Sequence, residues 1–357
     1  VLGLRKQSVL QKKGIDWGTA EALAFGSLLD EGFPVRLVGQ DSGRGTFSQR
    51  HSVLRDQQDN SRYIPLNNIS QNQKKFEIVD SLLSELAVLG FEYGYSLVEP
   101  NTLTVWEAQF GDFANGAQII IDQFITSSER KWMQMSGLVM LLPHGHEGMG
   151  PEHSSARLER FLQMAAEDNI QIVNCTTPAS YFHALRRQIH RNFRKPLIVF
   201  TPKSTLRHPN NISHIEEFTG KTSFHRVIDD DIKNPKRVVF CSGKIFYELD
   251  DYRSEHKIKD VKIIRIEQIY PFPFDRLSEI LMKYKDCEMI WAQEEPKNMG
   301  TWGFVKSRIR HVFVQNNYEK KIHYVGRRPA AAPATGISKR HITNQMLIKE
   351  LALKSSL

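Results

Sequence analysis

Residues 137–161 have the sequence GLVMLLPHGHEGMGPEHSSARLERF, which is typical of a strand, a loop and a helix in succession. The apolar run 137–143 indicates a buried strand. A helix is expected at 154–167, because Ser154 or Ser155 can cap its first turn. Open α/β sheets bind ligands at the carboxyl ends of their strands, and glycines let a ligand approach the backbone closely. The loop 144–152 is therefore a predicted ligand site in an α/β protein.

The same alternation extends along the chain in both directions and favours parallel α/β architecture. Helices are expected at 17–31, 77–90, 115–124, 154–167, 177–191 and 338–353. Strands are expected at 34–38, 102–106, 138–142, 170–174, 196–201, 237–241, 261–267, 289–293 and 322–325. The sequence thus predicts two α/β domains, the first with a parallel sheet.

The expected domain boundaries follow changes in composition. The first domain is expected at 14–205 and a smaller second one at 236–357, joined by a linker at 206–235 that carries prolines and an acidic run. Residues 1–13 are expected to be a disordered or partial lead-in. The first residue is Val1 rather than Met, which indicates a truncated or cut polypeptide or an expression product.

Composition excludes several classes of function. The chain has 357 residues, of which 40% are hydrophobic and 25% charged, and no apolar run approaches the roughly 20 residues that span a bilayer. The net charge of +8 is dispersed, without a basic stripe among stacking aromatics, so nucleic-acid binding is not expected. Cys175, Cys241 and Cys287 have no metal-binding spacing and are expected to be reduced, as in a cytoplasm or mitochondrial matrix.

Two segments contain candidate acid and base groups. His153 directly precedes the expected helix at 154–167, so its side chain can point into a cleft. His144 and His146 are both candidates for structural roles within the loop. Glu85 lies in the apolar row of the expected helix 77–90. Burial would raise the pKa of this carboxyl and favour a proton donor, but an exposed glutamate beside a turn is the alternative.

Two further segments are candidates for ligand binding. The loop WEAQFGDFANG, residues 106–116, can present Phe110 or Phe113 to a flat ring and Gln109 as a hydrogen-bonding group, although core packing is the more common fate of a phenylalanine. The loop QDSGRGTFSQRH, residues 40–51, can hold an anion or form an interface; its pattern alone is weakly specific.

Six long strings together closely resemble one family, the thiamin-diphosphate-dependent first component of 2-oxoglutarate dehydrogenase complexes. They are DSGRGTFSQRH, LTVWEAQFGDFANGAQIIIDQFI, LLPHGHEGMGPEHSSARLERFLQM, RKPLIVFTPKSTLRHP, RIEQIYPFP and QEEPKNMGTW. They occur in family order and extend from about Gly14 to the end. The resemblance implies a C-terminal half of transketolase-like plan, with a pyrimidine-binding domain and a smaller transketolase C-terminal-like domain.

The resemblance also implies roles for individual residues. Glu85 matches the glutamate that binds a ring nitrogen of the aminopyrimidine and activates thiamin diphosphate. Gln109 and Phe113 match the aminopyrimidine loop, with Phe113 as the stacking ring and Phe110 as the alternative. His153 matches the active-site histidine and is expected to handle a proton during transfer to the lipoyl group. His144 matches a neighbouring family histidine.

Implied partners and cofactors follow from the same family. The expected reaction is oxidative decarboxylation of 2-oxoglutarate and succinylation of the lipoyl group of dihydrolipoyl succinyltransferase, by a homodimer. The GDG-type segment that binds Mg²⁺ and the diphosphate is absent, so these are expected in a missing N-terminal half, and the chain alone is expected to be inactive. No metal ligand is assigned here. A 2-oxoadipate dehydrogenase, a split two-chain enzyme and a non-catalytic dimerisation module remain as alternatives.

Overall fold

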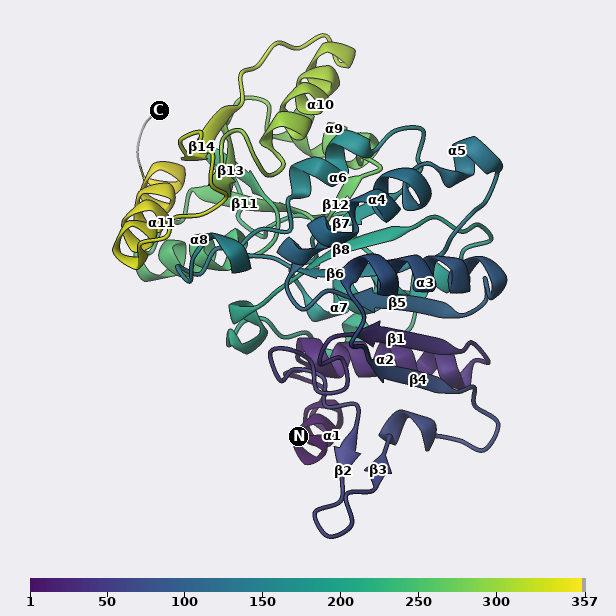
Figure 1. Ribbon diagram of the computed structural model, residues 1–357. Coiled ribbons are helices and arrows are strands. Elements are labelled where there is room, and N and C mark those ends of the chain that lie inside the picture. The colour runs from purple at the N-terminus through teal and green to yellow at the C-terminus, as the bar shows by residue number, and fades with distance from the viewer. Residues whose placement is uncertain (355–357) are drawn as a thin grey trace. The chain divides into compact units, whose positions relative to one another are not determined.

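The computed structural model describes residues 1–354, which divide into two compact α/β units (Figure 1). The first unit comprises residues 1–143 and 177–224, and the second comprises 144–176 and the chain from 225 onward. The predicted α/β class, with a parallel first sheet and a smaller second sheet, is confirmed. The sequence placed 144–176 with the first domain, whereas the structure groups them with the second unit.

The sheet of the first unit is parallel throughout. Its strands are β1 (Val35–Gly39), β4 (Phe76–Asp80), β5 (Leu103–Glu107), β6 (Val139–Pro143) and β8 (Leu197–Thr201). They lie in the order β8-β6-β5-β1-β4. Gly39 pairs with both Glu107 and Asp80, so the carboxyl ends of β1, β4 and β5 meet at one edge.

Helices cover the sheet of the first unit, and a side-chain cap starts the three longest of them. Helix α2 (Trp17–Asp30) begins where Asp16 accepts a hydrogen bond from the Thr19 amide at 2.8 Å. Helix α7 (Pro178–His190) packs against α2 and is capped by Thr177. Helix α3 (Glu85–Val98) is capped by Ser84 and packs on β5. The Arg36 guanidinium of β1 forms an ion pair with Glu92 of α3 at 2.8 Å, so this side of β1 faces α3.

The predicted helix at 77–90 is wrong in its first half. The chain forms strand β4 there and turns at Ser81–Ser84, and α3 begins only at Glu85. In the segment FEIVD, Phe76 and Ile78 are buried beside β1, and pairing with β1 prevails over helical spacing. Leu82 and Leu83 consequently lie in the turn and are exposed, instead of forming the apolar row that the sequence suggested.

Two other predicted helices are shorter or irregular. The segment 115–124 contains a 3-10 turn (Gly111–Ala117), one α-turn, α4 (Gln118–Ile120), and a π-turn (Ile121–Ile125). The helix expected at 154–167 is confined to α6 (Leu158–Met164), because Arg157 before it adopts a left-handed conformation with φ of 57°. The remaining predicted elements agree with the structure to within a few residues.

Several segments without a predicted element are ordered. Residues 2–10 form helix α1 (Leu2–Leu10), and Arg5 donates to the carbonyls of Gln49 and Arg50, both at 2.8 Å. Strands β2 (Leu54–Arg55) and β3 (Arg62–Tyr63) form a short hairpin. In the expected linker, Asp230 forms an ion pair with Arg253, next to strand β9 (Val227–Ile228).

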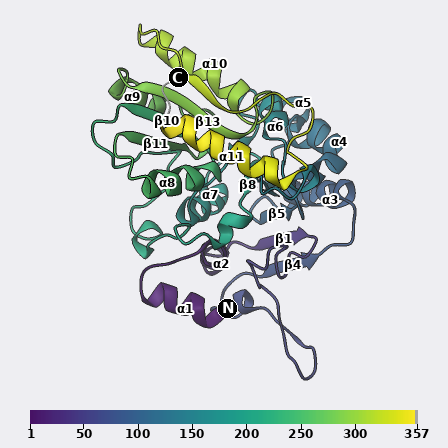
Figure 2. The ribbon, with the colours of Figure 1, turned by 90° about the vertical axis from the view of Figure 1, so that its left-hand side faces the viewer.

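The second unit has a mixed sheet between two pairs of helices. Its strands are β14 (His323–Arg327), β13 (Glu288–Pro296), β10 (Arg237–Cys241), β11 (Val261–Ile266) and β9, in that order, and only β9 is antiparallel. Strand β7 (Gln171–Val173) pairs antiparallel with β12 (Gln268–Tyr270). Helices α9 (Phe274–Lys283) and α10 (Trp302–Gln315) pack on one face of the mixed sheet. Helices α8 (Ile245–Glu255) and α11 (Ser338–Leu353) pack on the other, where α11 crosses β13 (Figure 2).

Among the residues that the structure describes, no helix is long and apolar enough to cross a membrane. Cys175 and Cys241 are buried, Cys287 is half-buried, and none of the three forms a disulfide. No group of three or more metal-type side chains gathers within residues 1–354.

Candidate active site

Glu85 is the first residue of α3 and lies at the edge of the first unit. Its side chain is half-buried, not fully buried as an apolar helix row would have made it. The segment Gly111–Ala117 packs against α3, and a Cβ added to Gly116 would stand 3.4 Å from Oε2 of Glu85. The glycine therefore keeps the approach to this carboxylate open, and any larger side chain would narrow it.

The predicted ring and amide residues follow directly after β5. Phe110 and Phe113 are half-buried, and their rings stand 6.1 Å apart at 90° to one another. Phe110 also packs edge-on against Phe47 and lies 5.8 Å from the Lys203 ammonium. The Gln109 amide donates to Asp41 at 3.2 Å. Glu85 and the segment that carries Phe113 are thus brought together, while Gln109 is engaged by the loop 40–51.

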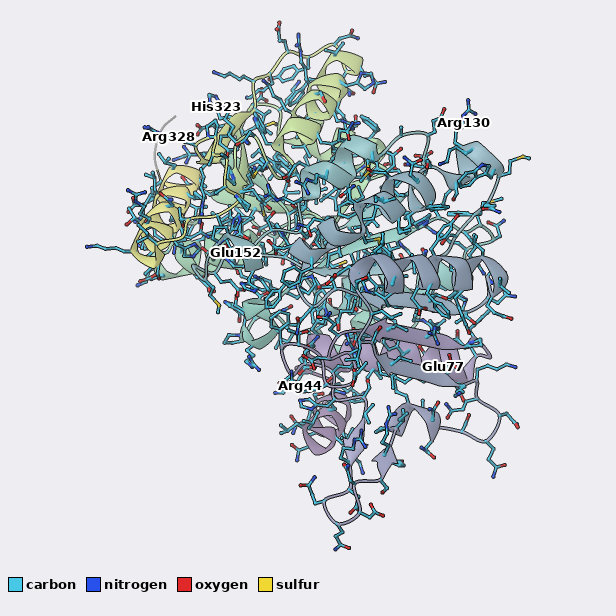
Figure 3. The ribbon with its side chains drawn as sticks, in the orientation of Figure 1. Arg44, Glu77, Arg130, Glu152, His323 and Arg328 are labelled. Carbon is cyan, nitrogen blue, oxygen red and sulfur yellow. The ribbon has the colours of Figure 1, made fainter. Side chains whose placement is uncertain are left out.

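The loop 40–51 is held to the sheet by a buried arginine. The Arg50 guanidinium is 3% exposed and contacts Glu21 at 2.5 Å and Glu107 at 2.6 Å. Tyr181 donates to Glu21 at 2.7 Å. Burial opposes the charge on Arg50, but Glu107 and Glu21 outweigh it and hold the pKa of the guanidinium well above its usual value. Both carboxylates occupy Arg50, so it is not available to an anion, whereas Arg44 on the same loop is exposed (Figure 3).

In the second unit, His144 anchors the glycine-rich loop to β13. Its Nε2 contacts Oε1 of Glu295 at 2.8 Å, and its Nδ1 accepts a hydrogen bond from the Ala156 amide at 3.1 Å. A nitrogen that accepts from an amide carries no proton, so Nε2 is the donor to Glu295. Burial raises the pKa of Glu295, but the hydrogen bond and the partial charge of His144 outweigh it and lower the pKa overall.

His146 lies in a buried polar cluster with β13 and α8. Its backbone amide donates to Oε1 of Glu294 at 3.1 Å, and Lys244 binds the other oxygen of that carboxylate at 3.0 Å. The imidazole is fully buried, and neither ring nitrogen has a hydrogen-bond partner within residues 1–354. Burial lowers the pKa of His146 to about 4, against the opposing charges of Glu294 and Glu295. His146 is therefore neutral near pH 7.

His153 ends the short 3-10 turn Pro151–His153 and is half-buried. The preceding Gly150 has φ of 103°, a conformation that glycine adopts readily, and its carbonyl accepts from the Ser154 hydroxyl at 2.6 Å. The turn and the hydrogen bond fix the backbone on both sides of His153. The histidine is thus placed on a constrained loop whose base is held by His144.

The sequence reading missed the acidic pair Glu294 and Glu295. The predicted strand ended at Gln293, whereas β13 continues to Pro296 and buries both carboxylates. Two adjacent carboxylates directly after a buried apolar strand were the available signal. Buried carboxylates require cationic or hydrogen-bonding partners, and Lys244 and His144 supply them here.

Comparisons with known proteins agree with this geometry. Residues 13–209 match the family model for the transketolase pyrimidine binding domain, and residues 212–353 match the model for the 2-oxoglutarate dehydrogenase C-terminal region. The 2-oxoglutarate dehydrogenase E1 component of Brucella anthropi is 56% identical over 355 residues, which cover 96% of this chain and 36% of the relative. That of Brucella abortus strain S19 is 55% identical, over 96% of this chain and 35% of the relative.

The chain spans about a third of the length of these curated relatives. The pyrimidine-binding match alone covers more than half of the chain, and it includes Glu85 and the segment of Phe110 and Phe113. The pyrimidine-binding domain is a component of thiamin-diphosphate proteins. The chain therefore belongs to the transketolase pyrimidine-binding family and corresponds to the C-terminal portion of a 2-oxoglutarate dehydrogenase E1 component.

Proposed function

We propose that this chain holds the aminopyrimidine side of thiamin diphosphate in an enzyme that oxidatively decarboxylates 2-oxoglutarate. The observation that carries the proposal is the carboxylate of Glu85 at the start of α3, beside the segment Gly111–Ala117. The match of residues 13–209 to the pyrimidine-binding family supports it independently.

The residues around Glu85 fit a flat, hydrogen-bonding heterocycle. Gly116 leaves the carboxylate accessible. The ring planes of Phe110 and Phe113 are perpendicular, so a flat heterocycle can contact the face of one ring and the edge of the other. Thiamin diphosphate, when bound, supplies the thiazolium carbon that attacks the keto carbon and accepts the electrons released with carbon dioxide. In this proposal Glu85 holds a proton at a ring nitrogen, Phe113 stacks on the ring, and Gln109 donates a hydrogen bond.

The histidines of the second unit have separable proposed roles. His153 holds and moves a proton during transfer to the lipoyl group, a task that suits an imidazole near neutral pH. His144 uses both ring nitrogens for the loop and β13, and these contacts support a positioning role beside the catalytic role that the family suggests. The proposal places Mg²⁺ and the diphosphate on residues outside these 357, because the relatives are about three times as long.

A second copy of the chain is the proposed partner at the edge that carries Glu85. Large apolar side chains are exposed along β4, the turn after it and α3: Val79, Leu82, Leu83, Leu86 and Phe91. A concentration of exposed apolar side chains commonly marks an interface, and isologous dimers cover the same surface on both subunits. Covering it would also exclude water from Glu85. Replacing Leu82 and Leu83 by Asp should yield monomers in sedimentation, whereas Val314→Asp in α10 should not.

The further partners are proposed from the family. The succinyl group would pass to the lipoyl group of dihydrolipoyl succinyltransferase. The relatives above come from bacteria, which supports a bacterial cytoplasm over a mitochondrial matrix as the location.

The proposal is tested by replacing the matched portion of the Brucella anthropi relative with this chain. The chimera should release carbon dioxide from 2-oxoglutarate, and Glu85→Gln should lower kcat at least about 100-fold because the loss of a positioned proton carrier typically has such an effect. Glu99→Gln, at the exposed end of α3, is the matched control. Calorimetry with thiamin diphosphate and Mg²⁺ should show weaker binding to Glu85→Gln.

Full activity of the Glu85→Gln chimera would overturn the assigned site. A preference of the chimera for 2-oxoadipate over 2-oxoglutarate would favour the related dehydrogenase instead. The 357-residue chain alone should bind the cofactor weakly and should not turn over substrate.

A further inference from the structure

A cavity lies entirely within the second unit. It has a volume of about 580 Å³ and lies between the segment that follows β14 and one face of α11. Residues 326–335 form one wall. The other wall is formed by side chains of α11 at helical spacing, namely Arg340, Asn344, Leu347 and Ile348.

The lining of this cavity carries only one sign of charge. Arg327, Arg328 and Arg340 all contribute to it, and no aspartate or glutamate does. Throughout the described chain, none of these three arginines forms an ion pair with a carboxylate. Arg328, which follows β14, is exposed (Figure 3). Arg340, in α11, is exposed as well. Three guanidinium groups without a directly paired carboxylate create a positive potential around the cavity, which favours an anion.

Arg327 is the central group, because it is 7% exposed yet incompletely paired. Its Nη2 donates to Oε1 of Gln345 at 2.9 Å and lies 3.0 Å from Nδ1 of His341. Its Nε and Nη1 have no hydrogen-bond partner within residues 1–354. Burial lowers the pKa of Arg327, because desolvation outweighs the favourable charges of Glu294 and Glu295. Nε and Nη1 lie on different edges of the planar guanidinium, so each can donate a separate charge-assisted hydrogen bond to an oxygen.

A second unused polar group lies on the same wall as Arg327. The Thr335 hydroxyl is buried and has no partner in the part of the chain that the structure describes. Buried polar groups in folded proteins are nearly always hydrogen-bonded, so an unsatisfied one calls for an explanation. An oxyanion in the cavity can accept from the Thr335 hydroxyl and from one of the two free donors of Arg327.

The frame of the cavity is held firmly. The Asn298 side chain donates to the Ala330 carbonyl and accepts from the Ala330 amide, both at 3.0 Å. The Arg327 carbonyl accepts from Tyr324 Oη at 2.8 Å and from the Lys297 amide at 3.1 Å. These contacts tie the wall 326–335 to β13 and the turn after it. The site is therefore largely formed before any ligand binds, which reduces the entropy that binding must overcome.

We propose that this cavity binds a small organic anion, whose phosphate or carboxylate group is held by Arg327, Arg328, Arg340 and Thr335. The apolar part of the ligand would lie on Leu347, which is half exposed, and Ile348 of α11. This site is separate from the site at Glu85, which lies in the other unit, and does not depend on the proposed decarboxylation.

Calorimetric titration of the 357-residue protein with inorganic phosphate, phenyl phosphate and citrate tests the proposal. Phosphate or citrate should bind, and the one with the higher affinity shows whether the natural ligand carries a phosphate or a carboxylate group. The double variant Arg328→Ala, Arg340→Ala should weaken binding at least about tenfold, because two charge-assisted contacts are lost. Both side chains are exposed, so the fold should be unaffected. Arg310→Ala, an exposed arginine of α10, is the matched control and should bind like the parent protein.

The apolar wall has its own test. Phenyl phosphate should bind at least about threefold more tightly than phosphate, and Leu347→Ser should remove that difference while phosphate binding stays unchanged. Thermal-shift measurements with the same probes give a second readout. Equal weakening in Arg310→Ala and in the double variant would show unspecific charge attraction and overturn the proposal. Absence of binding by all three probes at about 10 mM would overturn it as well.

Discussion

Nε2 of His144 donates a hydrogen bond to Oε1 of Glu295 at 2.8 Å, although 151 positions separate the two residues in the sequence. The opposite nitrogen of the same ring accepts from the Ala156 amide at 3.1 Å. A ring that donates on one side and accepts on the other has a fixed orientation. His144 therefore closes the glycine-rich loop on itself and attaches it to β13.

His144→Ala should destabilise the protein by about 3 kcal/mol. The substitution leaves the buried Glu295 carboxylate and the Ala156 amide without their partner, and an unpaired buried charge is costly. Urea unfolding followed by tryptophan fluorescence measures the change. Met149→Ala on the same loop is the control, since Met149 is 76% exposed, and should change stability by less than about 0.5 kcal/mol. Equal stability of the two variants would contradict the anchoring role of His144.

Stability should fall as the pH is lowered from 6.5 towards 4, and His146 is a main cause. In the folded protein burial lowers the pKa of His146 from 6.5 to about 4, so between these values the unfolded chain binds a proton that the folded chain does not. The loss over this range should be about 3 kcal/mol, since each pKa unit corresponds to about 1.4 kcal/mol. Urea midpoints measured at several pH values give the slope.

His146→Phe provides the matched comparison for this slope. Phenylalanine keeps a buried ring but does not titrate, so the dependence between pH 6.5 and 4 should become shallower. The charged and titratable groups that face the ring, Glu294, Glu295, Arg327 and His144, are unchanged. The pKa values of Glu294 and Glu295 are lowered in the folded state, so both proteins should still lose stability on further acidification below about pH 4.5. An unaltered slope in His146→Phe would contradict the assignment to this imidazole.

The sequence predicted most elements of the fold, and its failures have local causes. Helix α11 begins and ends at the predicted residues. A helix was wrongly predicted for residues 77–84 because Ile78, Leu82 and Leu83 have helical spacing. In the structure Phe76–Asp80 pairs with β1, and the two leucines lie in the turn after it. Pairing between distant segments cannot be derived from local spacing.

Prediction of the site was limited by the same long-range contacts. The motif around residues 106–116 pointed to Phe110, Phe113 and Gln109, and the structure places that segment beside Glu85. The anchoring of His144 by Glu295 depends on a strand extension near residue 295, which no pattern around residue 144 reveals. The roles of the site residues stay predictions until they are measured.

Arg50→Leu should destabilise the protein by about 3–5 kcal/mol. The guanidinium is buried between Glu21 and Glu107, and its loss leaves two buried carboxylates close together without a cation. Arg50→Lys should recover only part of the loss, because an ammonium cannot make paired contacts with both carboxylates. Arg44→Ala, 55% exposed on the same loop, is the control. The denaturation midpoint should therefore be highest for Arg44→Ala, lower for Arg50→Lys and lowest for Arg50→Leu. An Arg50→Leu variant as stable as the parent protein would contradict the role of this network.

Gly145→Ala should destabilise the protein by about 1–3 kcal/mol, because Gly145 has φ of 146° and side chains with a Cβ rarely adopt that conformation. The new methyl group would also stand 3.1 Å from Cδ of Lys244, which binds Glu294. Gly303→Ala in α10 of the same unit meets nothing within 4 Å and should stabilise the helix by roughly 0.5 kcal/mol. Thermal unfolding of the two variants should therefore shift in opposite directions, and a shift in the same direction would mean that backbone conformation at residue 145 is not limiting.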